Sequence, residues 1–242
     1  MKSLIIGVVA AAFTATVAFA DSHAVRMGTE GAYEPYNFIN DKGEVDGYER
    51  ELGDKLCEIA GYSCTWVKND WDSIIPNLTS GNYDTIMAGM SITDERKEKI
   101  NFTEAYFPPD PSAYVSLAGA DAEVINGNVA AQTNTIQAGH VSNSGATLVE
   151  YATPDETIAA VRNGEADAVM ADKAYLRKLV EESGGELEFV GEDVMLGTGI
   201  GMGIRKSDEE MLAKFNAAIQ QLKSDGTINT LIEKWFEMKG PY

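Results

Sequence analysis

Short apolar runs follow helix-like stretches along the chain, and one such unit occurs twice. Residues 75–89 carry the pattern I-x-x-L-x-x-G-x-x-D-x-I-M-A-G, and residues 158–172 carry I-x-x-V-x-x-G-x-x-D-x-V-M-A-D. Each copy reads as the end of a helix, then a glycine that terminates it, then a short buried strand. The repeat predicts two similarly built α/β lobes.

The same periodicity predicts further elements and their ends. Thr93 precedes two acidic residues and is typical of a helix start, while T-P-D-E at residues 153–156 and S-D-E-E at residues 207–210 are typical of capping boxes. The predicted strands cover residues 85–90 and 128–131, and the predicted helices cover residues 173–180, 208–223 and 227–236.

Two segments are expected to connect the lobes. Residues 106–111 contain three prolines, which are excluded from central strands. Residues 196–204 alternate glycine with other residues and are interpreted as a pliable return strand, because the glycine spacing does not match a dinucleotide-binding fingerprint. This predicts a first lobe over residues 21–109, a second lobe over residues 110–195, and a return to the first lobe over residues 196–242.

The first twenty residues have the features of a secretory signal peptide. Lys2 precedes an apolar stretch over residues 4–19, and Ala18-Phe19-Ala20 fits a cleavage site. We expect cleavage after Ala20 and export to the periplasm. The residue directly after the cleavage site is Asp21 and not a cysteine, and no later segment reaches transmembrane length, so neither a lipid anchor nor membrane insertion is expected.

Charge and histidine content limit the possible partners. The chain has 19 lysines and arginines against 38 aspartates and glutamates, a formal net charge of −19. Such a chain is a poor partner for nucleic acids or anionic membranes. His23 and His140 are the only histidines and lie far apart without ligand-type neighbours, so no metal site and no cofactor are expected.

Cys57 and Cys64 are the only cysteines, and six residues separate them. In an oxidising compartment they can form one disulfide. That bridge would join the end of a helix, which Gly61 breaks, to a strand that begins at Cys64. A catalytic thiol is the alternative.

Polar side chains gather where the predicted strands end. Ser91 and Arg96 lie at one strand-to-helix corner, which suits a carboxylate or a phosphate, although a helix cap plus a surface arginine is the alternative. Asp172 ends the second copy of the repeat, where a helix N-cap is the alternative. Residues 132–137 form a third polar turn. Because open α/β sheets bind ligands at strand ends, Arg96 and Asp172 would fit the carboxylate and ammonium of an α-amino acid.

Several stretches together resemble the periplasmic solute-binding proteins of polar amino-acid ABC transporters, particularly the histidine and lysine/arginine/ornithine binders. The resemblance implies an α/β fold of two lobes, the type II arrangement, with a central sheet in each lobe and a two-strand hinge. The stretches that carry it are residues 28–38, 47–49, 71–76, 84–93 with Arg96, 102–103, 164–172 and 199–205.

The resemblance also implies roles for individual residues. Arg96 and Ser91 would hold the ligand carboxylate, and Asp172 would hold the ammonium. Aromatic side chains would sandwich the aliphatic stem, and a glutamate would face the distal group. The implied ligand-binding set is Glu30, Tyr33, Trp71, Gly89, Met90, Ser91, Arg96, Thr135, Ile136 and Asp172.

Simpler roles remain open for three of these residues. Tyr33 and Trp71 could be ordinary core aromatics, and Glu30 could be a solvated loop acid. Ala88 and Gly89 stand where some relatives carry serines, and Ile136 stands where many carry threonine. These departures affect the side-chain end of the site. A buried glutamate would require a cation or a donor, which favours a basic ligand.

The predicted function is periplasmic binding of a polar, basic L-amino acid such as arginine, lysine or ornithine, and its delivery to an inner-membrane ABC permease. The protein is expected to be a monomer. One alternative is a dehydratase-like periplasmic enzyme of the same fold, which would need an acid or base at the reacting bond. Another is a soluble sensor subunit that presents its ligand to a receptor.

Overall fold

The computed structural model describes residues 24–242, so the predicted signal peptide and His23 lie outside the described residues. The helices are α1 (Tyr48–Ala60), α2 (Ile74–Thr79), α3 (Asp94–Lys97), α4 (Ile136–Ser144), α5 (Pro154–Arg162), α6 (Lys173–Glu182), α7 (Glu209–Ser224) and α8 (Thr227–Phe236), with 3₁₀ turns η1 (Trp71–Ser73) and η2 (Ala122–Asn126). None of these helices is long and apolar enough to cross a membrane.

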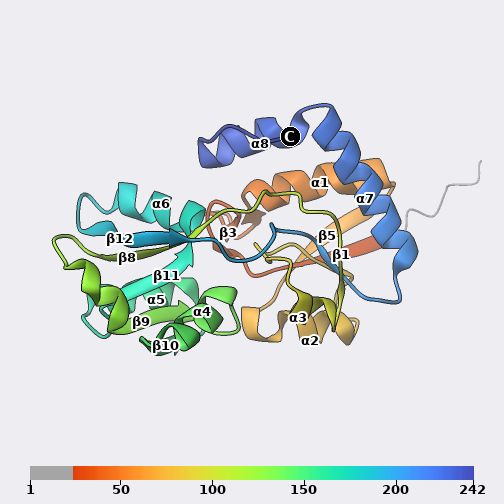
Figure 1. Cartoon of the computed structure of the whole chain (residues 1–242). Coiled ribbons are helices and arrows are strands. Elements are labelled where there is room, and N and C mark those ends of the chain that lie inside the picture. Colours follow the sequence, from red (N-terminus) through yellow and green to blue (C-terminus); the bar gives the residue numbers. More distant parts are fainter. Residues whose placement is uncertain (1–23) are drawn as a thin grey trace, which may run out of the picture.

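The strands form two separate five-stranded mixed sheets, one in each of two lobes, as predicted (Figure 1). A third, small sheet joins β2, β3 and β4. The strands are β1 (Ala24–Thr29), β2 (Ala32–Tyr33), β3 (Asn37–Ile39), β4 (Val45–Asp46), β5 (Ser63–Lys68), β6 (Thr85–Ile86), β7 (Asn101–Phe102), β8 (Ser112–Leu117), β9 (Asn128–Gln132), β10 (Thr147–Tyr151), β11 (Ala168–Asp172), β12 (Leu187–Val194) and β13 (Gly203–Ile204).

The first lobe is built on the sheet with strand order β5-β1-β6-β13-β7. Strand β1 runs parallel to β5 and β6, whereas β13 runs antiparallel to both of its neighbours. Helices α1, α7 and α8 pack against one another on one side of this lobe, and α2 and α3 lie on the other side (Figure 1). The parallel strands direct their carboxyl ends toward the second lobe, where ligands bind in open α/β sheets.

The second lobe is built on the sheet with strand order β10-β9-β11-β8-β12. Strand β9 is parallel to β10 and β11, and β8 is antiparallel to β11 and β12. Helices α4, α5 and α6 pack on this sheet. The two lobes therefore share a parallel β-α-β core, which is the structural basis of the repeat found in the sequence.

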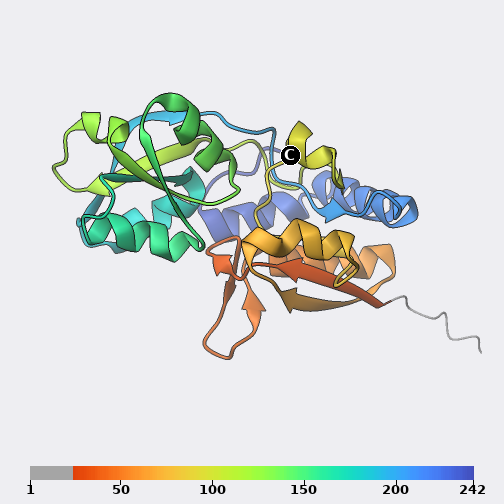
Figure 2. The ribbon, with the colours of Figure 1, turned by 90° about the horizontal axis from the view of Figure 1, so that it is seen from below.

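Two segments carry the chain between the sheets, residues 103–111 after β7 and residues 195–202 after β12 (Figure 2). They pair at a single antiparallel bridge between Phe107 and Ile200, where the Tyr106 backbone N–H donates to the Ile200 carbonyl at 2.9 Å. Phe107 also packs against the Phe236 ring, with 4.6 Å between ring centroids. The predicted lobe boundaries fall inside these segments, and their exact positions stay a prediction.

Local signals in the sequence account for most element ends. Gly81 and Gly164 adopt φ angles of 82° and 72°, the left-handed conformation that glycine tolerates after a helix. Thr153 forms the predicted capping box with Glu156. The first copy of the repeat has a shorter strand than predicted, because β6 ends at Ile86 and Gly89 turns the chain with a φ of 59°.

The capping box predicted at residues 207–210 is wrong. Asp208 is the N-cap of α7, but its side chain caps no backbone N–H. Its carboxylate forms an ion pair with the Arg205 guanidinium at 2.7 Å instead, and it accepts a hydrogen bond from the Ser207 hydroxyl. An ion pair between neighbouring residues has taken the place of the cap, while the helix itself forms as expected.

Cys57 in α1 and Cys64 in β5 form the predicted disulfide, with 6.1 Å between their Cα atoms. In the chain-entropy model, closing so short a loop lowers the entropy of the unfolded chain and stabilises the folded state by roughly 2–3 kcal/mol. We therefore expect the Cys57→Ala, Cys64→Ala double variant to lose about that much free energy of unfolding. Urea unfolding followed by circular dichroism measures it, and an unchanged midpoint would contradict the estimate.

Candidate functional site

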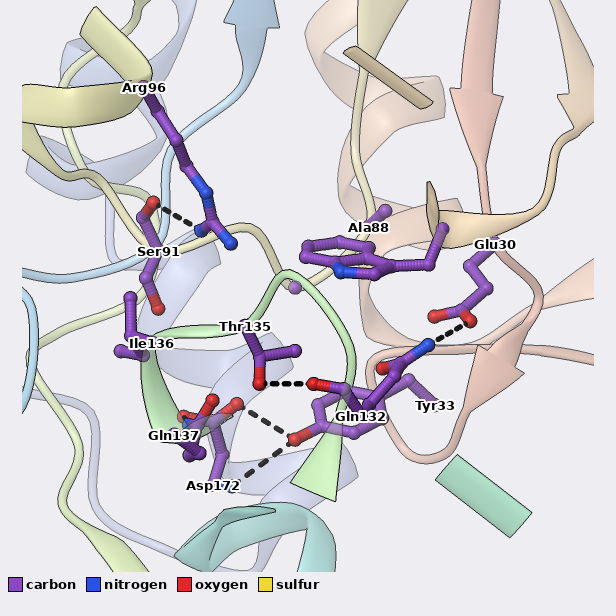
Figure 3. Close-up of a pocket in the computed structure, with 12 residues that line it drawn as sticks. Glu30, Tyr33, Ala88, Ser91, Arg96, Gln132, Thr135, Ile136, Gln137 and Asp172 are labelled. Atoms are coloured by element: carbon purple, nitrogen blue, oxygen red, sulfur yellow. Dashed lines mark hydrogen bonds between the residues drawn. The ribbon is translucent and has the colours of Figure 1, made fainter. Parts of the chain in front are cut away.

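A cavity lies between the two lobes at the carboxyl ends of their parallel strands (Figure 3). All predicted ligand-binding residues except Met90 line it. Met90 is fully buried and packs instead in a hydrophobic cluster of which Trp71 is also a member. The lining residues are Glu30, Tyr33, Trp71, Ala88, Gly89, Ser91, Arg96, Gln132, Thr135, Ile136, Gln137 and Asp172.

Arg96 brings a buried positive charge to one side of this cavity. Thr93 caps α3 by accepting from the Arg96 backbone N–H, which fixes where the side chain starts. The guanidinium donates to the Ser91 carbonyl at 2.8 Å and to the Asn134 carbonyl at 3.1 Å, and lies 5.3 Å from the centre of the Trp71 ring. Burial lowers the pKa of Arg96 to about 10, so it stays charged at neutral pH.

This guanidinium has no carboxylate partner within 4.0 Å among residues 24–242, although only 9% of Arg96 is exposed. A buried charge without an ionic partner is costly. The guanidinium uses backbone carbonyls for two of its five N–H donors, which leaves donors for an anion. The alternative interpretation as a surface arginine is therefore wrong.

Asp172 brings a partly buried carboxylate to the same cavity from the end of β11. It occupies the N-cap position of α6, as the helix-cap alternative expected, but its side chain makes no capping hydrogen bond, so capping does not explain the carboxylate. Its Oδ2 accepts from the Tyr33 hydroxyl at 2.8 Å, and its Oδ1 accepts from the Gln137 amide at 3.0 Å. Burial raises the pKa of Asp172 to about 6. Both partners are neutral, so a cation can still supply the opposite charge.

Glu30 is the second carboxylate of the cavity, directly after β1. Only 5% of the residue is exposed, which contradicts the interpretation as a solvated loop acid. Its Oε1 accepts from the Gln132 amide of the second lobe at 2.6 Å. Burial raises its pKa to about 7. Figure 3 shows Arg96 and Glu30 on opposite sides of the cavity, with Asp172 below them.

Two aromatic side chains line the cavity and are almost wholly buried. Tyr33 and Trp71 are each 8% exposed. The Tyr33 ring stacks on Tyr175 of α6 with 4.2 Å between centroids and 14° between planes. The Trp71 indole N–H is buried without a hydrogen-bond partner in the described part of the chain. Both aromatics therefore belong to the core and to the cavity wall, so neither interpretation excludes the other.

The turn before α4 supplies another part of the cavity wall. Thr135 is the N-cap of α4, and its hydroxyl accepts from the Ala138 backbone N–H at 3.1 Å and donates to the Gln132 carbonyl at 2.6 Å. Asn134 adopts a φ of 57°, and its carbonyl accepts from the Arg96 guanidinium. The first backbone N–H groups of a helix have no intrahelical partner and favour an anion. This helix start and Arg96 border one side of the cavity.

Sequence reasoning identified residues 132–137 as a polar turn but did not single out Gln132 and Gln137. These amides of the second lobe donate hydrogen bonds to the two carboxylates that line the cavity, Glu30 and Asp172. The available signal was two glutamines at the ends of one polar turn. Within residues 24–242, no group of three His, Cys, Asp or Glu side chains could share a metal ion.

The chain belongs to the bacterial extracellular solute-binding proteins, family 3, whose model matches residues 25–238. It is 32% identical to an L-arginine-binding protein of Pseudomonas aeruginosa, over 98% of this chain and 97% of that protein. It is 31% identical to the lysine/arginine/ornithine-binding periplasmic protein of Escherichia coli, over 88% and 87% of the two chains.

A solved structure from Silicibacter pomeroyi is also similar. It is a periplasmic His/Glu/Gln/Arg/opine family-binding protein in complex with lysine, with 69% sequence identity and a TM-score of 0.87. The similarity covers 90% of this chain and all of that one. These matches agree with the resemblance seen in the sequence and with the two-lobed type II architecture.

Proposed function

We propose that this protein binds a basic L-amino acid in the periplasm and delivers it to an inner-membrane ABC permease. The observation that carries the proposal is the set of three ionisable groups that line one cavity, the buried Arg96 guanidinium, the buried Glu30 carboxylate and the partly buried Asp172 carboxylate. An L-amino acid with a cationic side chain has the complementary set, one carboxylate and two cations. Lysine, arginine and ornithine meet this requirement, and the names of the similar proteins support the same class of ligand.

Each charge has a proposed partner on the ligand. The α-carboxylate binds Arg96, Ser91 and the helix start at Thr135 and Ile136. The α-ammonium binds Asp172. The aliphatic stem lies between Tyr33 and Trp71, beside the Gly89 backbone, and the distal cation reaches Glu30. Met90 supports this wall from the core and makes no direct contact in this proposal.

The site is proposed to close by a hinge at residues 103–111 and 195–202. Three hydrogen bonds join residues of different lobes, so the cavity is complete only when the lobes meet. The bonded pairs are Tyr33 with Asp172, Glu30 with Gln132, and Arg96 with Asn134. Small-angle X-ray scattering is expected to show a smaller radius of gyration with saturating lysine than without it. An unchanged profile at saturation would contradict hinge closure.

Glu30→Gln is expected to change ligand preference while leaving the amino-acid site in place. Glutamine keeps the size of the side chain but removes the charge that faces the distal cation. Lysine or arginine binding should weaken by roughly 1.5–3 kcal/mol, the range for hydrogen bonds to charged groups. Glutamine binding should change much less. Calorimetric titrations of both proteins with these ligands measure the difference, and equal losses for all ligands would indicate a structural role for Glu30.

The same residue should make lysine binding depend on pH. Burial raises the pKa of Glu30 to about 7, so the carboxyl group is mostly protonated at pH 6 and mostly ionised at pH 8. A cation prefers the ionised form, so lysine affinity should rise about tenfold over this interval. Asp172, whose pKa is about 6, adds a smaller rise for every amino acid. Glu30→Gln should retain only that smaller rise, and glutamine serves as the control ligand.

The family and the named relatives are binding proteins, and we propose that this chain also binds without chemical turnover. Glu30 and Asp172 each have a binding role in the cavity, and no histidine lines it. Amino acid recovered unchanged by mass spectrometry after incubation separates binding from dehydratase-like activity. The proposal includes cleavage of a signal peptide after Ala20, a periplasmic location and a monomeric state. A sensor role would use the same site.

A further inference from the structure

Glu49 is a fully buried carboxylate that the proposed binding site does not use. It is the second residue of α1, at the helix end where a negative charge is favourable, yet it is completely inaccessible to solvent. No lysine or arginine forms an ion pair with it within residues 24–242. Hydrogen bonds from three separate parts of the first lobe and its connection to the second lobe hold it instead.

The three donors come from elements that lie far apart in the sequence. Glu49 Oε2 accepts from the Asn37 amide of β3 at 2.7 Å. Glu49 Oε1 accepts from the Gly89 backbone N–H at 2.8 Å and from the Tyr106 hydroxyl. A backbone N–H can only donate, and the Asn37 oxygen already accepts from the Gly31 N–H at 2.7 Å. These partners therefore require an acceptor at both oxygens, which a carboxylate provides and an amide does not.

Two of these contacts position backbone beside the ligand cavity. Gly89 lines the cavity, and a Cβ atom there would lie 3.2 Å from the Tyr33 ring. Gly31 follows Glu30 directly and is held through Asn37. The third contact leads to the hinge, because Tyr106 lies in residues 103–111 and its N–H pairs with the Ile200 carbonyl of the other connecting segment.

We propose that Glu49 is a positioning residue that couples the ligand cavity to the hinge, an inference that rests on the proposed function. It fixes the Gly89 and Gly31 backbone where the ligand stem and distal group bind. Through Tyr106 it links that backbone to the paired connecting segments. A shift of Gly89 on ligand binding is thereby transmitted to the segments about which the lobes rotate.

The chain offers a matched control for this coupling. Tyr48 and Tyr106 are both fully buried tyrosines, and the Tyr48 hydroxyl donates to the Tyr106 carbonyl at 2.8 Å. Tyr48→Phe therefore removes a hydrogen bond to the same segment without touching Glu49. Tyr106→Phe removes the bond to Glu49 itself. Differences between these variants report the role of the carboxylate rather than the loss of a buried hydroxyl.

The test combines lysine titrations with the wild type, Glu49→Gln, Tyr106→Phe, their double variant and Tyr48→Phe. We expect Glu49→Gln to weaken lysine binding about tenfold, and Tyr106→Phe by a smaller factor in the same direction. Glu49 and Tyr106 act through the same hydrogen bond, so their effects should not add. The double variant should bind lysine no more than about twofold more weakly than Glu49→Gln does. Tyr48→Phe should stay within about twofold of the wild type.

Hydrogen exchange of the free protein gives a second readout that needs no ligand. Tyr106→Phe should speed exchange of the Gly89 amide, whose hydrogen bond goes to Glu49 and not to Tyr106, whereas Tyr48→Phe should not. Equal effects of the two tyrosine variants would overturn the coupling, as would wild-type affinity in Glu49→Gln with only a lower melting temperature. If the wild type binds no basic amino acid, the proposed function fails, and the exchange measurement still decides the coupling.

Discussion

Arg96→Met is expected to abolish binding of amino acids while the protein still folds. The guanidinium is the buried positive charge of the cavity, and its removal leaves the ligand carboxylate desolvated without a partner. Truncating one partner of a buried, hydrogen-bonded charge pair costs roughly 2–5 kcal/mol or more, which corresponds to roughly 30-fold to several-thousand-fold in affinity. The free energy of unfolding should change little, because a costly buried charge is replaced by an apolar side chain of similar length.

Arg162→Met is the matched control for this variant. Arg162 lies in α5 of the second lobe, its side chain is 40% exposed, and it pairs with Glu186 at 3.0 Å. Exposed ion pairs contribute little, so its loss should not alter ligand affinity. Cadaverine, which is lysine without the carboxylate, should bind poorly to the wild type and lose nothing further in Arg96→Met. Wild-type lysine affinity in Arg96→Met would show that the carboxylate site is placed wrongly.

Asp172→Asn is expected to cause the second large loss. Tyr33 and Gln137 donate to the two carboxylate oxygens, and an asparagine keeps only one acceptor and no charge. The α-ammonium of the ligand then loses its ionic partner in a buried site. We expect lysine binding to weaken by a factor similar to that of Arg96→Met, at least about 30-fold. Isothermal titration calorimetry measures the change.

A ligand without the α-ammonium makes this prediction specific. The compound 6-aminohexanoate keeps the carboxylate and the distal cation of lysine. It should bind the wild type weakly and should lose little more in Asp172→Asn, because the interacting pair is already broken. Asp193→Asn, which removes an exposed partner of Lys173, is the control for the substitution itself. A large additional loss of 6-aminohexanoate affinity would indicate that Asp172 acts through the fold of the cavity.

Local sequence signals, each confined to a few neighbouring residues, predicted much of this structure. Gly81 and Gly164 terminate helices because their backbone adopts positive φ, and Thr153 caps α5 through residues only three positions away. Cys57 and Cys64 are close in sequence and in space. Such features depend on neighbouring residues alone, so they can be inferred without the tertiary fold. The same reasoning failed at Asp208, where an arginine three residues earlier competed for the carboxylate.

The candidate site was predictable in part, because strand ends in α/β proteins converge. That rule brought Arg96 and Asp172 together, whereas Glu30, Tyr33 and Trp71 entered through the family resemblance. The contacts that complete the cavity could not be inferred, since Gln132 and Glu30 are 102 positions apart and Tyr33 and Asp172 are 139 apart. The role of Glu49 could not be inferred for a related reason. An acid in the first turn of a helix is usually solvated, and only the tertiary fold buries Glu49.

The most direct test of the central claim is a calorimetric titration of the mature protein with lysine, arginine, ornithine, histidine, glutamine and glutamate under identical conditions. Three cavity-lining charges of the observed signs predict saturable binding at one site, with a basic amino acid bound at least about tenfold more tightly than glutamate. Arg96→Met, titrated in parallel, should give no saturable heat. Tightest binding of glutamate, or the absence of saturable heat with every amino acid in the wild type, would contradict the account.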